Sequence, residues 1–331
     1  MNSQTFRRIQ IQRTGPAQVM ELNNVEFEPL NPDEVRVRLT RIGINFSEIN
    51  FRWGRYGFAP AQFPYTPGIE GVGRIEAIGS EVDGLTIGDR VVMAAGGANQ
   101  MYSEAVQVKA TTIVPLPDTI SDEVAAAIAL KGLMARSLLL DVRRVAPGDT
   151  VLVHGATGGV SIILAQWAKH LGATVIGTVG HRSKVAAASA AGCETVLVRE
   201  DGHFIEALNR VTDNKGVAVV YDPLGAETIQ ESFLALQRRG TVVSYGNTSG
   251  IVKAVDPLWL TRSSLYFTRP MLHDFITNND QRRASAAELF GLVEAGIIKP
   301  AIAEVMPLAR VVQAHELVET RRAIGAVVLA T

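Results

Sequence analysis

The middle of the chain alternates strand-like and helix-like segments, and this alternation limits the possible folds more than any other feature. The run "TVLVHGATGGVSIILAQWAKHLGATVIGTVG" (150–180) contains a strand, a glycine turn, a helix over roughly 159–170 and a second strand. The rhythm continues with a helix over 182–191 and the strand-like runs "ETVLVRE", "VAVVYDPLG" and "GTVVSYGN". Strands that alternate with helices of about 10–15 residues are typical of a doubly wound parallel sheet. An α/β fold is therefore expected.

The flanking parts of the chain follow other patterns. Residues 1–120 contain short strand-like runs ("EVRVRLTRIGIN", "GVGRIEAIG", "GDRVVMAA") between turn residues, as in a β-rich unit. Helical periodicity then begins near Ser121, a predicted N-cap that Asp122 and Glu123 follow in the first turn. After 250, "SAAELFGLVEAGII" predicts an amphipathic helix, and the last 31 residues predict a strand, a helix and a strand.

Length and composition exclude several classes of protein. A chain of 331 residues suits two domains, and its net charge of −1 provides no bulk attraction for nucleic acid or anionic membranes. We expect no membrane span and no signal peptide, because no long apolar run exists and "MNSQTFRRIQIQR" lacks an apolar core. Cys193 is the only cysteine, which excludes an intrachain disulfide and fits a cytoplasmic location.

The glycine turn resembles a dinucleotide-binding fingerprint, G-x-G-x-x-G, with Ala156, Gly158 and Ser161 at the three glycine positions. The second position, where the pyrophosphate approaches the backbone, keeps its glycine. The N–H groups at the start of the following helix would still face an anion. Serine at the third position should cost at most about 1–2 kcal/mol. We therefore predict a dinucleotide site; a simple strand-to-helix turn is the alternative.

The end of the second strand indicates which dinucleotide binds. Folds that select NAD place an acid there, which bonds the ribose 2′-OH, whereas this chain has "GTVGHRSK" with Arg182 and Lys184. A cation attracts a 2′-phosphate through charge-assisted hydrogen bonds. The sequence therefore predicts NADPH, and two solvated basic side chains are the alternative interpretation.

Several segments together resemble the zinc-independent NADPH:quinone oxidoreductases of the medium-chain dehydrogenase/reductase superfamily. They include "IGINFSEINFRWGRYG", "PGIEGVGRIEAIGSEVDGLTIGDRV", "LKGLMARSLL", "RRGTVVSYGNTSG" and "SLYFTRP", in family order. The resemblance implies a GroES-like catalytic domain (1–120), a Rossmann NADP(H)-binding domain (121–270) and a C-terminal segment (271–331) that returns to the catalytic domain. The active site would lie in the cleft between the domains. The protein would be a homodimer joined through the edges of its Rossmann sheets, with "TVVSYGN" and the segment that follows it as the expected edge.

The resemblance also implies particular site residues. Lys184 would contact the 2′-phosphate, and Arg199 stands where the family has a tyrosine that assists it. The run "FTR" (267–269) would correspond to the family's loop beside the nicotinamide. Asn45 and Tyr56 would line the nicotinamide and substrate crevice, polarise an acceptor carbonyl and, for Tyr56, donate a proton. The cofactor-binding residues expected in this way are Asn45, Gly158, Gly159, Val160, Gly180, Arg182, Lys184, Arg199, Tyr245, Gly246, Asn247, Phe267, Thr268 and Arg321.

No metal site is expected. Zinc-dependent members that resemble this chain need a cysteine near position 45 and a His-Glu pair near position 69, where this chain has Asn45, Ile69 and Glu70. Without a metal, hydride transfer to an acceptor that is already electrophilic is the easier chemistry. We expect an NADPH-dependent reductase that transfers hydride to a small-molecule electrophile, a quinone or a similar conjugated compound. Reduction of the C=C bond of an enone or enoyl thioester, and NADPH binding without catalysis, are the alternatives.

Overall fold

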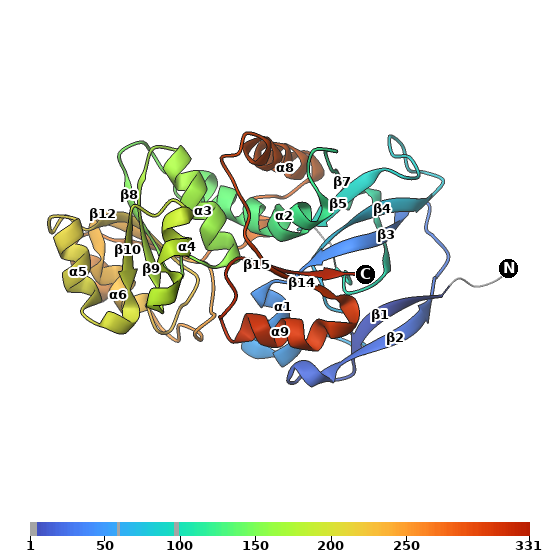
Figure 1. Ribbon diagram of the computed structural model, residues 1–331, viewed down its shortest axis with the longest axis horizontal. Coiled ribbons are helices and arrows are strands. Elements are labelled where there is room, and N and C mark those ends of the chain that lie inside the picture. The colour runs from blue at the N-terminus through green and yellow to red at the C-terminus, as the bar shows by residue number, and fades with distance from the viewer. Residues whose placement is uncertain (1–4, 58–59, 96–98) are drawn as a thin grey trace. The chain divides into compact units, whose positions relative to one another are not determined.

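The computed structural model describes residues 5–57, 60–95 and 99–331 (Figure 1). The chain forms two compact units. Unit 1 comprises Met1–Leu130, Ile276–Glu294 and Pro300–Thr331, and unit 2 comprises Lys131–Phe275 and Ala295–Lys299. The change from unit 1 to unit 2 falls within the helix α2 (Asp122–Arg136).

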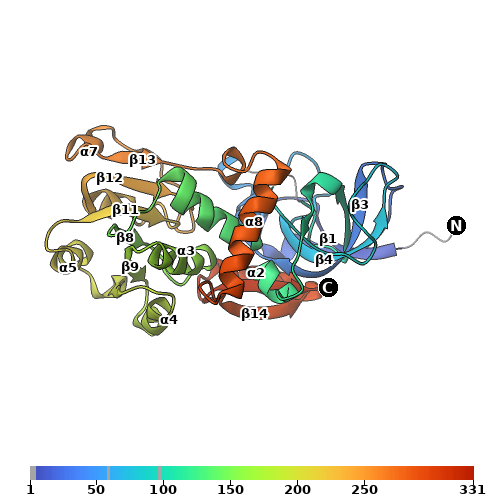
Figure 2. The ribbon, with the colours of Figure 1, turned by 90° about the horizontal axis from the view of Figure 1, so that it is seen from above.

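Unit 2 is built on a parallel six-stranded sheet with the strand order β10-β9-β8-β11-β12-β13. The predicted doubly wound α/β fold is confirmed in this unit, since every strand pair is parallel. In Figure 2, β13 lies beside β12 at one edge of the sheet. The strands are β8 (Thr150–Val153), β9 (Thr174–Val179), β10 (Thr195–Val198), β11 (Val217–Asp222), β12 (Leu236–Ser244) and β13 (Tyr266–Thr268).

Helices connect these strands. The helix predicted over 159–170 is confirmed as α3 with the same bounds, whereas the segment predicted as a helix over 182–191 divides into a short 3-10 turn and α4. The helices of unit 2 are η4 (Ser137–Val142), α3 (Gly159–His170), η5 (Arg182–Lys184), α4 (Val185–Ala190), η6 (Arg199–Asp201), α5 (Phe204–Val211), α6 (Ile229–Leu234), α7 (Leu258–Thr261) and η7 (Leu272–Asp274).

The core of unit 2 lies where strands are covered on both faces. All six residues of β11 are buried, as expected for a central strand of a parallel sheet with helices on either side. Leu152, Ile176 and Val220 from three neighbouring strands pack with Phe204 and Leu208 of α5. The uninterrupted apolar runs of the sequence therefore correspond to strands buried on both faces.

Unit 1 contains a two-stranded sheet, β1-β2, and a seven-stranded sheet with the order β14-β15-β3-β4-β5-β7, in which β6 also pairs with β3. Its strands are β1 (Thr5–Ile11), β2 (Met20–Glu26), β3 (Glu34–Gly43), β4 (Glu70–Ile78), β5 (Arg90–Ala94), β6 (Ala105–Lys109), β7 (Val114–Pro115), β14 (Ile302–Pro307) and β15 (Ala326–Ala330). Its helices are η1 (Ala17–Val19), α1 (Phe46–Trp53), η2 (Arg55–Gly57), η3 (Ala110–Thr112), α8 (Asn279–Glu294), η8 (Leu308–Arg310) and α9 (Val311–Glu319), together with most of α2.

Several sequence predictions for unit 1 are confirmed. The Ser121 hydroxyl oxygen accepts a hydrogen bond from Val124 N at 3.2 Å, as expected of an N-cap at the start of α2. The last part of the chain forms the predicted strand, helix and strand, β14, α9 and β15. The amphipathic helix predicted near 285–298 is α8, which begins earlier, at Asn279.

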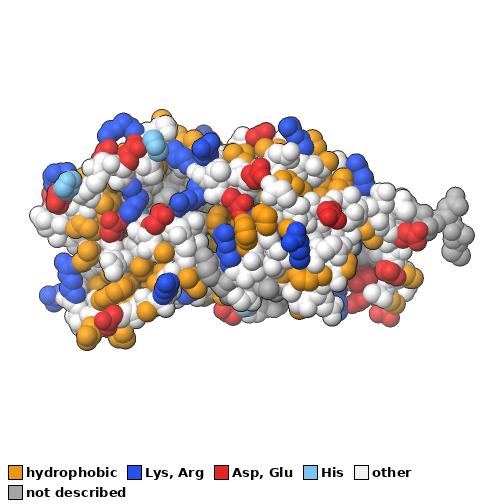
Figure 3. Space-filling model, turned by 90° about the horizontal axis from the view of Figure 1, so that it is seen from below, with side chains coloured by type: hydrophobic (Ala, Val, Ile, Leu, Met, Phe, Trp, Pro, Cys, Tyr) orange, Lys and Arg blue, Asp and Glu red, His pale blue; other side chains and the backbone are white. Residues whose placement is uncertain are grey.

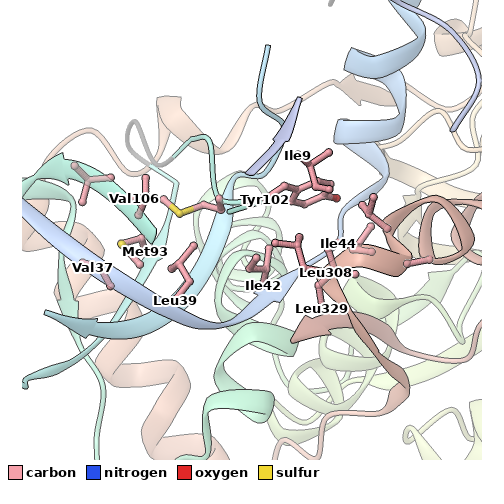
Figure 4. Close-up of a cluster of buried hydrophobic side chains, with 14 of the residues drawn as sticks. Ile9, Val37, Leu39, Ile42, Ile44, Met93, Tyr102, Val106, Leu308 and Leu329 are labelled. Atoms are coloured by element: carbon pink, nitrogen blue, oxygen red, sulfur yellow. The ribbon is translucent and has the colours of Figure 1, made fainter. Parts of the chain in front are cut away.

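The core of unit 1 joins residues from both ends of the chain (Figure 4). Val37 and Leu39 of β3 are buried, in agreement with the alternation in "EVRVRLTRIG". Leu308 and Leu329, almost three hundred positions later, belong to the same cluster. Because β15 pairs with β3 in antiparallel register, the C-terminal strand completes the sheet that the N-terminal residues begin.

The surface carries both signs of charge. Figure 3 shows acidic and basic side chains interspersed on one face, without a continuous basic region. In the ranges that the structure describes, no helix is both long enough and apolar enough to span a membrane.

Candidate functional site

The turn that precedes α3 lies at the carboxyl edge of the sheet of unit 2. Gly155 has a φ of +57°, so the left-handed conformation of the tight turn falls on this residue. The fingerprint alignment assigned that position to Ala156, whose side chain is instead buried. Gly155 is thus a turn residue that the alignment missed, although a glycine two positions after the end of a strand was a usable signal. Gly158 is the N-cap of α3, and its carbonyl accepts from Ile162 N at 2.9 Å.

Two glycines at this edge have no structural need to be glycine. A Cβ added to Gly158 would meet no protein atom closer than 3.4 Å, and one added to Gly180 would meet none within 4 Å. Neither residue has a positive φ. The fold itself would accept a side chain at both positions. The absence of a side chain there is therefore consistent with a ligand that closely approaches the backbone. The N–H groups of Gly159 and Val160 in the first turn of α3 point in the direction that favours an anion.

Ser161 fills the third fingerprint position without an unpaired polar group. Its side chain is buried, and its hydroxyl donates to the His154 carbonyl oxygen at 3.4 Å. The Tyr245 hydroxyl lies 3.1 Å from Ser161 Oγ and donates to it. Burial raises the pKa of Tyr245 above its ordinary value, so this phenol keeps its proton. Tyr245 follows β12, and the pair connects the start of α3 to the end of that strand.

The predicted 2′-phosphate residues lie in the loops that follow β9 and β10. Arg182 and Lys184 are in η5, and Arg199 is in η6; since β9 and β10 are parallel neighbours, the two loops lie at the same edge. The structure also brings acids there. Arg182 Nη2 donates to both carboxylate oxygens of Asp201, at 2.8 and 2.7 Å, and Arg199 forms an ion pair with Glu231. The sequence analysis named neither acid.

The loop after β12 is tightly packed. A Cβ on Gly246 would lie 2.3 Å from the Pro223 carbonyl oxygen, so the fold itself requires glycine at this position. In the orientation that satisfies both ends of its amide, Asn247 donates to Gly246 O at 2.8 Å and accepts from Arg269 Nη2 at 3.1 Å. These contacts hold the predicted cofactor residues Gly246 and Asn247 in one conformation.

Phe267 and Thr268 were expected in a loop beside the nicotinamide. The structure places both in the short strand β13 instead. The Phe267 ring packs 5.8 Å from the ring of Phe233 within an apolar cluster of unit 2. The local run "LYFTR" carries the aromatic and β-branched residues typical of a strand, which explains the difference.

Asp222 is a structural carboxylate. Its oxygens accept hydrogen bonds from the main-chain N–H groups of Leu224 and Gly225 and from the hydroxyls of Thr228 and Ser232, at 2.8–3.0 Å. Such a saturated and buried carboxylate shapes the turn after β11 and has no oxygen left for a substrate.

In unit 1, Asn45 is held between two buried carboxylates. Its side-chain amide donates to Glu70 Oε2 at 3.1 Å, and its main-chain N–H donates to Glu48. Glu70 Oε1 also accepts from Leu130 N at 2.7 Å, and Glu48 Oε1 accepts from Ile69 N at 3.1 Å. One of the two amide hydrogens of Asn45 therefore points at Glu70, which fixes the orientation of the amide.

A buried chain of hydrogen bonds leads to Glu48. Arg52 Nη1 donates to His315 Nδ1 at 2.8 Å, so the hydrogen of the neutral ring is on Nε2, which lies 2.8 Å from the Tyr102 hydroxyl. Tyr102 in turn hydrogen-bonds Glu48. Burial, with a smaller contribution from Arg52, lowers the pKa of His315 to about 3. The charge of Arg52 is balanced by Glu319, at 2.5 Å. Sequence analysis missed this chain, since its members are up to 267 positions apart.

Tyr56 and Arg321 are the two remaining residues of the predicted site. Tyr56 belongs to η2, but its side chain lies outside the described residues, so its catalytic role stays a prediction. Arg321 follows α9 in unit 1 with a φ of +55°. Its contact with the cofactor likewise stays a prediction.

The donor set near Asn45 does not fit a catalytic zinc ion. An amide and the apolar Ile69 stand where the cysteine and histidine ligands would be needed, and both oxygens of Glu70 are already hydrogen-bonded. Among the residues with a described placement, no group of three or more His, Cys, Asp or Glu side chains could hold a metal ion.

A chain that combines a parallel sheet with a glycine turn at its carboxyl edge and a β-rich unit that both chain ends build is a dehydrogenase/reductase of the medium-chain type. A family model described as a zinc-binding dehydrogenase matches residues 159–289, and one described as an alcohol dehydrogenase GroES-like domain matches residues 31–118. The chain belongs to the quinone oxidoreductase family of this superfamily, as its motifs predicted.

The individual similarities extend over nearly the whole chain. Quinone oxidoreductase 1 of Escherichia coli is 39% identical over 327 residues, which are 97% of this chain and 98% of the relative. A 2-haloacrylate reductase of a Burkholderia species is 35% identical over 307 residues, 90% of this chain and 91% of the relative. The solved structure of an Escherichia coli quinone oxidoreductase complexed with NADPH matches with a TM-score of 0.92 and 38% identity, over 98% of this chain and 100% of that chain.

Proposed function

We propose that this protein is a zinc-independent reductase that uses NADPH to reduce a quinone or a similar conjugated electrophile. One observation carries the proposal: the carboxyl edge of the unit 2 sheet combines the start of α3, two glycines that the fold does not require, and the cations Arg182 and Lys184. The NADPH complex of a quinone oxidoreductase that is 38% identical supports the choice of cofactor.

In this proposal each part of the edge has a distinct task. The N–H groups of Gly159 and Val160 bind the pyrophosphate, while Arg182 and Lys184 bind the 2′-phosphate. Gly158 and Gly180 leave room for the cofactor to approach the backbone. The other proposed cofactor contacts are Tyr245, Gly246, Asn247, Phe267, Thr268 and Arg321. The contact predicted for Arg199 is not part of this proposal, because its guanidinium is paired with Glu231. When bound, NADPH supplies the hydride.

Asn45 is proposed to polarise the acceptor. Since one of its amide hydrogens points at Glu70, the second hydrogen can be donated to a carbonyl oxygen of the substrate. Such a donor stabilises the negative charge that develops on that oxygen as the carbon framework accepts a hydride. A proton from Tyr56 or from solvent then completes the conversion of the quinone to the hydroquinone.

A C=C reductase is the second candidate, because the 2-haloacrylate reductase relative is 35% identical over 90% of the chain. A conjugated carbonyl needs the same polarisation from Asn45, but the hydride goes to the β-carbon of the alkene. An NADPH-binding protein without catalytic activity is the third candidate.

Steady-state kinetics separate the candidates. NADPH oxidation is followed with 1,4-benzoquinone, 2-chloroacrylate and a crotonyl thioester as acceptors. Turnover of benzoquinone with a higher kcat/KM than either alkene supports the proposal. Turnover of the alkenes alone contradicts it in favour of the C=C reductase, and tight NADPH binding without any turnover supports the third candidate.

We also propose a homodimer that forms through β13. The predicted edge segment "TVVSYGN" belongs mainly to β12, which pairs with β11 on one side and β13 on the other and has no free edge. Among the described residues, the sheet ends on this side at β13, in the segment that follows. Tyr266 of β13 is 52% exposed, which leaves apolar surface at the edge for a second copy of the chain.

A further inference from the structure

Two of the three cations predicted for the 2′-phosphate, Arg182 and Arg199, each form an ion pair with a carboxylate. Arg182 Nη2 lies 2.8 and 2.7 Å from the two carboxylate oxygens of Asp201, and the main-chain N–H of Arg182 donates to Glu200 Oε1 at 2.8 Å. The Arg182 and Asp201 side chains are 71% and 47% exposed. This pair therefore lies in solvent, where a competing anion can separate it at low cost.

Arg199 is held much more firmly. Its guanidinium forms an ion pair with Glu231, donates to Glu227 O at 3.4 Å and lies 5.7 Å from the centroid of the Phe204 ring. Only 22% of its side chain is exposed. To reach a phosphate, Arg199 would have to give up three contacts, so its guanidinium is a fixed part of the unit 2 surface.

The charges around the two loops balance. Arg182, Lys184 and Arg199 contribute three positive charges, and Glu200, Asp201 and Glu231 contribute three negative ones. A 2′-phosphate brings a charge of about −1.5 to −2. A guanidinium donates to carboxylate oxygens and to phosphate oxygens through the same N–H groups. Since both oxygens of Asp201 already accept from Nη2 of Arg182, phosphate and Asp201 compete for this nitrogen.

We propose that Asp201 is a specificity-determining residue, which occupies Arg182 in the free protein and thereby limits the preference for NADPH over NADH. Glu231 is a positioning residue that keeps Arg199 out of this competition. The 2′-phosphate is bound by Arg182 only after the Arg182–Asp201 pair opens, and Asp201 then adds repulsion to the bound phosphate. This inference rests on the proposed function, because it assumes that NADPH binds at this edge.

The test compares two substitutions of the same kind. Asp201→Asn removes the competing charge, while Asp213→Asn removes another exposed acid, whose partner is Lys215, 3.9 Å away. Dissociation constants are measured for NADPH, NADH and adenosine 2′,5′-bisphosphate. For Asp201→Asn we expect the NADPH and bisphosphate constants to fall by about threefold to fivefold, with the NADH constant unchanged. Asp213→Asn should leave all three constants as in the wild type.

A second pair of variants separates the two arginines. Arg182→Gln should weaken NADPH binding by about tenfold or more and leave NADH binding unchanged. Arg199→Gln should change the NADPH constant by less than about twofold, while it lowers the urea midpoint of unfolding. Equal losses of NADPH affinity in the two variants contradict the division of roles.

Each remaining outcome has one meaning. An unchanged NADPH constant in Asp201→Asn, or an equal gain for NADH, overturns the role of Asp201 while the proposed function stands. The same gain in Asp213→Asn also overturns that role, because the effect would then be a general one of net charge. A wild-type protein that fails to bind NADPH contradicts the proposed function together with this inference.

Discussion

The hydroxyl oxygens of Ser161 and Tyr245 lie 3.1 Å apart and join the start of α3 to the end of β12. A fingerprint glycine would leave the Tyr245 hydroxyl without this partner. Serine at the third position therefore replaces close backbone packing with a specific hydrogen bond. A side-chain hydrogen bond, rather than direct packing of helix on strand, then holds the start of α3 against the sheet.

This pair can be tested by a double-mutant cycle. Ser161→Ala and Tyr245→Phe should each lower the free energy of unfolding by about 1 kcal/mol, since each leaves a buried hydroxyl or its partner unpaired. The double variant should be less destabilised than the sum, by about 1 kcal/mol. Urea denaturation provides the measurement, and Ser183→Ala, at an exposed serine of η5, is the control. Additive losses would contradict the coupling.

Glu48 should be needed both for stability and for the orientation of Asn45. Glu48→Gln places an amide NH₂ among three donors, the N–H groups of Asn45 and Ile69 and the Tyr102 hydroxyl. We expect a loss of about 2–3 kcal/mol in the free energy of unfolding. In the folded fraction, kcat with benzoquinone should fall while the KM for NADPH stays the same. The exposed Glu81→Gln is the matched control, and an unchanged kcat in Glu48→Gln would disprove the positioning of Asn45 by Glu48.

The buried, neutral His315 should make the folded protein less stable at acid pH. Burial lowers its pKa in the folded protein to about 3 from an ordinary value of 6.5, which applies to the unfolded chain. Between these values the unfolded chain binds a proton that the folded protein does not. The free energy of unfolding should therefore fall as the pH decreases from about 6.5, by up to about 1.4 kcal/mol per pH unit.

His315→Gln is the variant that checks this dependence, because glutamine can accept from Arg52 and donate to Tyr102 without titrating. Denaturant unfolding at pH 7, 6 and 5 should show a shallower pH slope than in the wild type. His154, whose pKa burial lowers to about 4, keeps part of the slope in the variant. Identical slopes in the two proteins would mean that His315 is not the group responsible.

The proposed dimer predicts an effect of charge on β13. Tyr266→Lys places an ammonium group on the exposed edge strand, where a second copy of the chain would bring the same charge opposite to it. Sedimentation velocity should show dimers of the wild type and monomers of the variant. Val211→Lys, at an exposed apolar residue of α5, should leave the dimer intact. A wild-type monomer would contradict the proposal directly.

Much of the fold could be predicted from local patterns. The helix over 159–170, the Ser121 N-cap and the strands β8 to β12 follow from periodicity and capping residues, which act over a few neighbouring positions. The turn glycine was assigned one position too late, because a fixed-spacing alignment cannot show which residue takes a positive φ. The strand β13 was missed as well, since three residues are too short for a reliable period.

The sequence by itself determined the α/β class, the quinone oxidoreductase resemblance and the cationic run after β9, because each depends on residues close together in the chain. Tertiary structure alone decided which charges meet: Asp201 on Arg182, Glu231 on Arg199, and the chain from Arg52 to Glu48. Electrostatic and hydrogen-bond energies depend on separation in space, and folding brings together side chains up to 267 positions apart. The cations could be predicted from the sequence. That Asp201 lies against Arg182 follows only from the pairing of β9 with β10, which brings the two loops together.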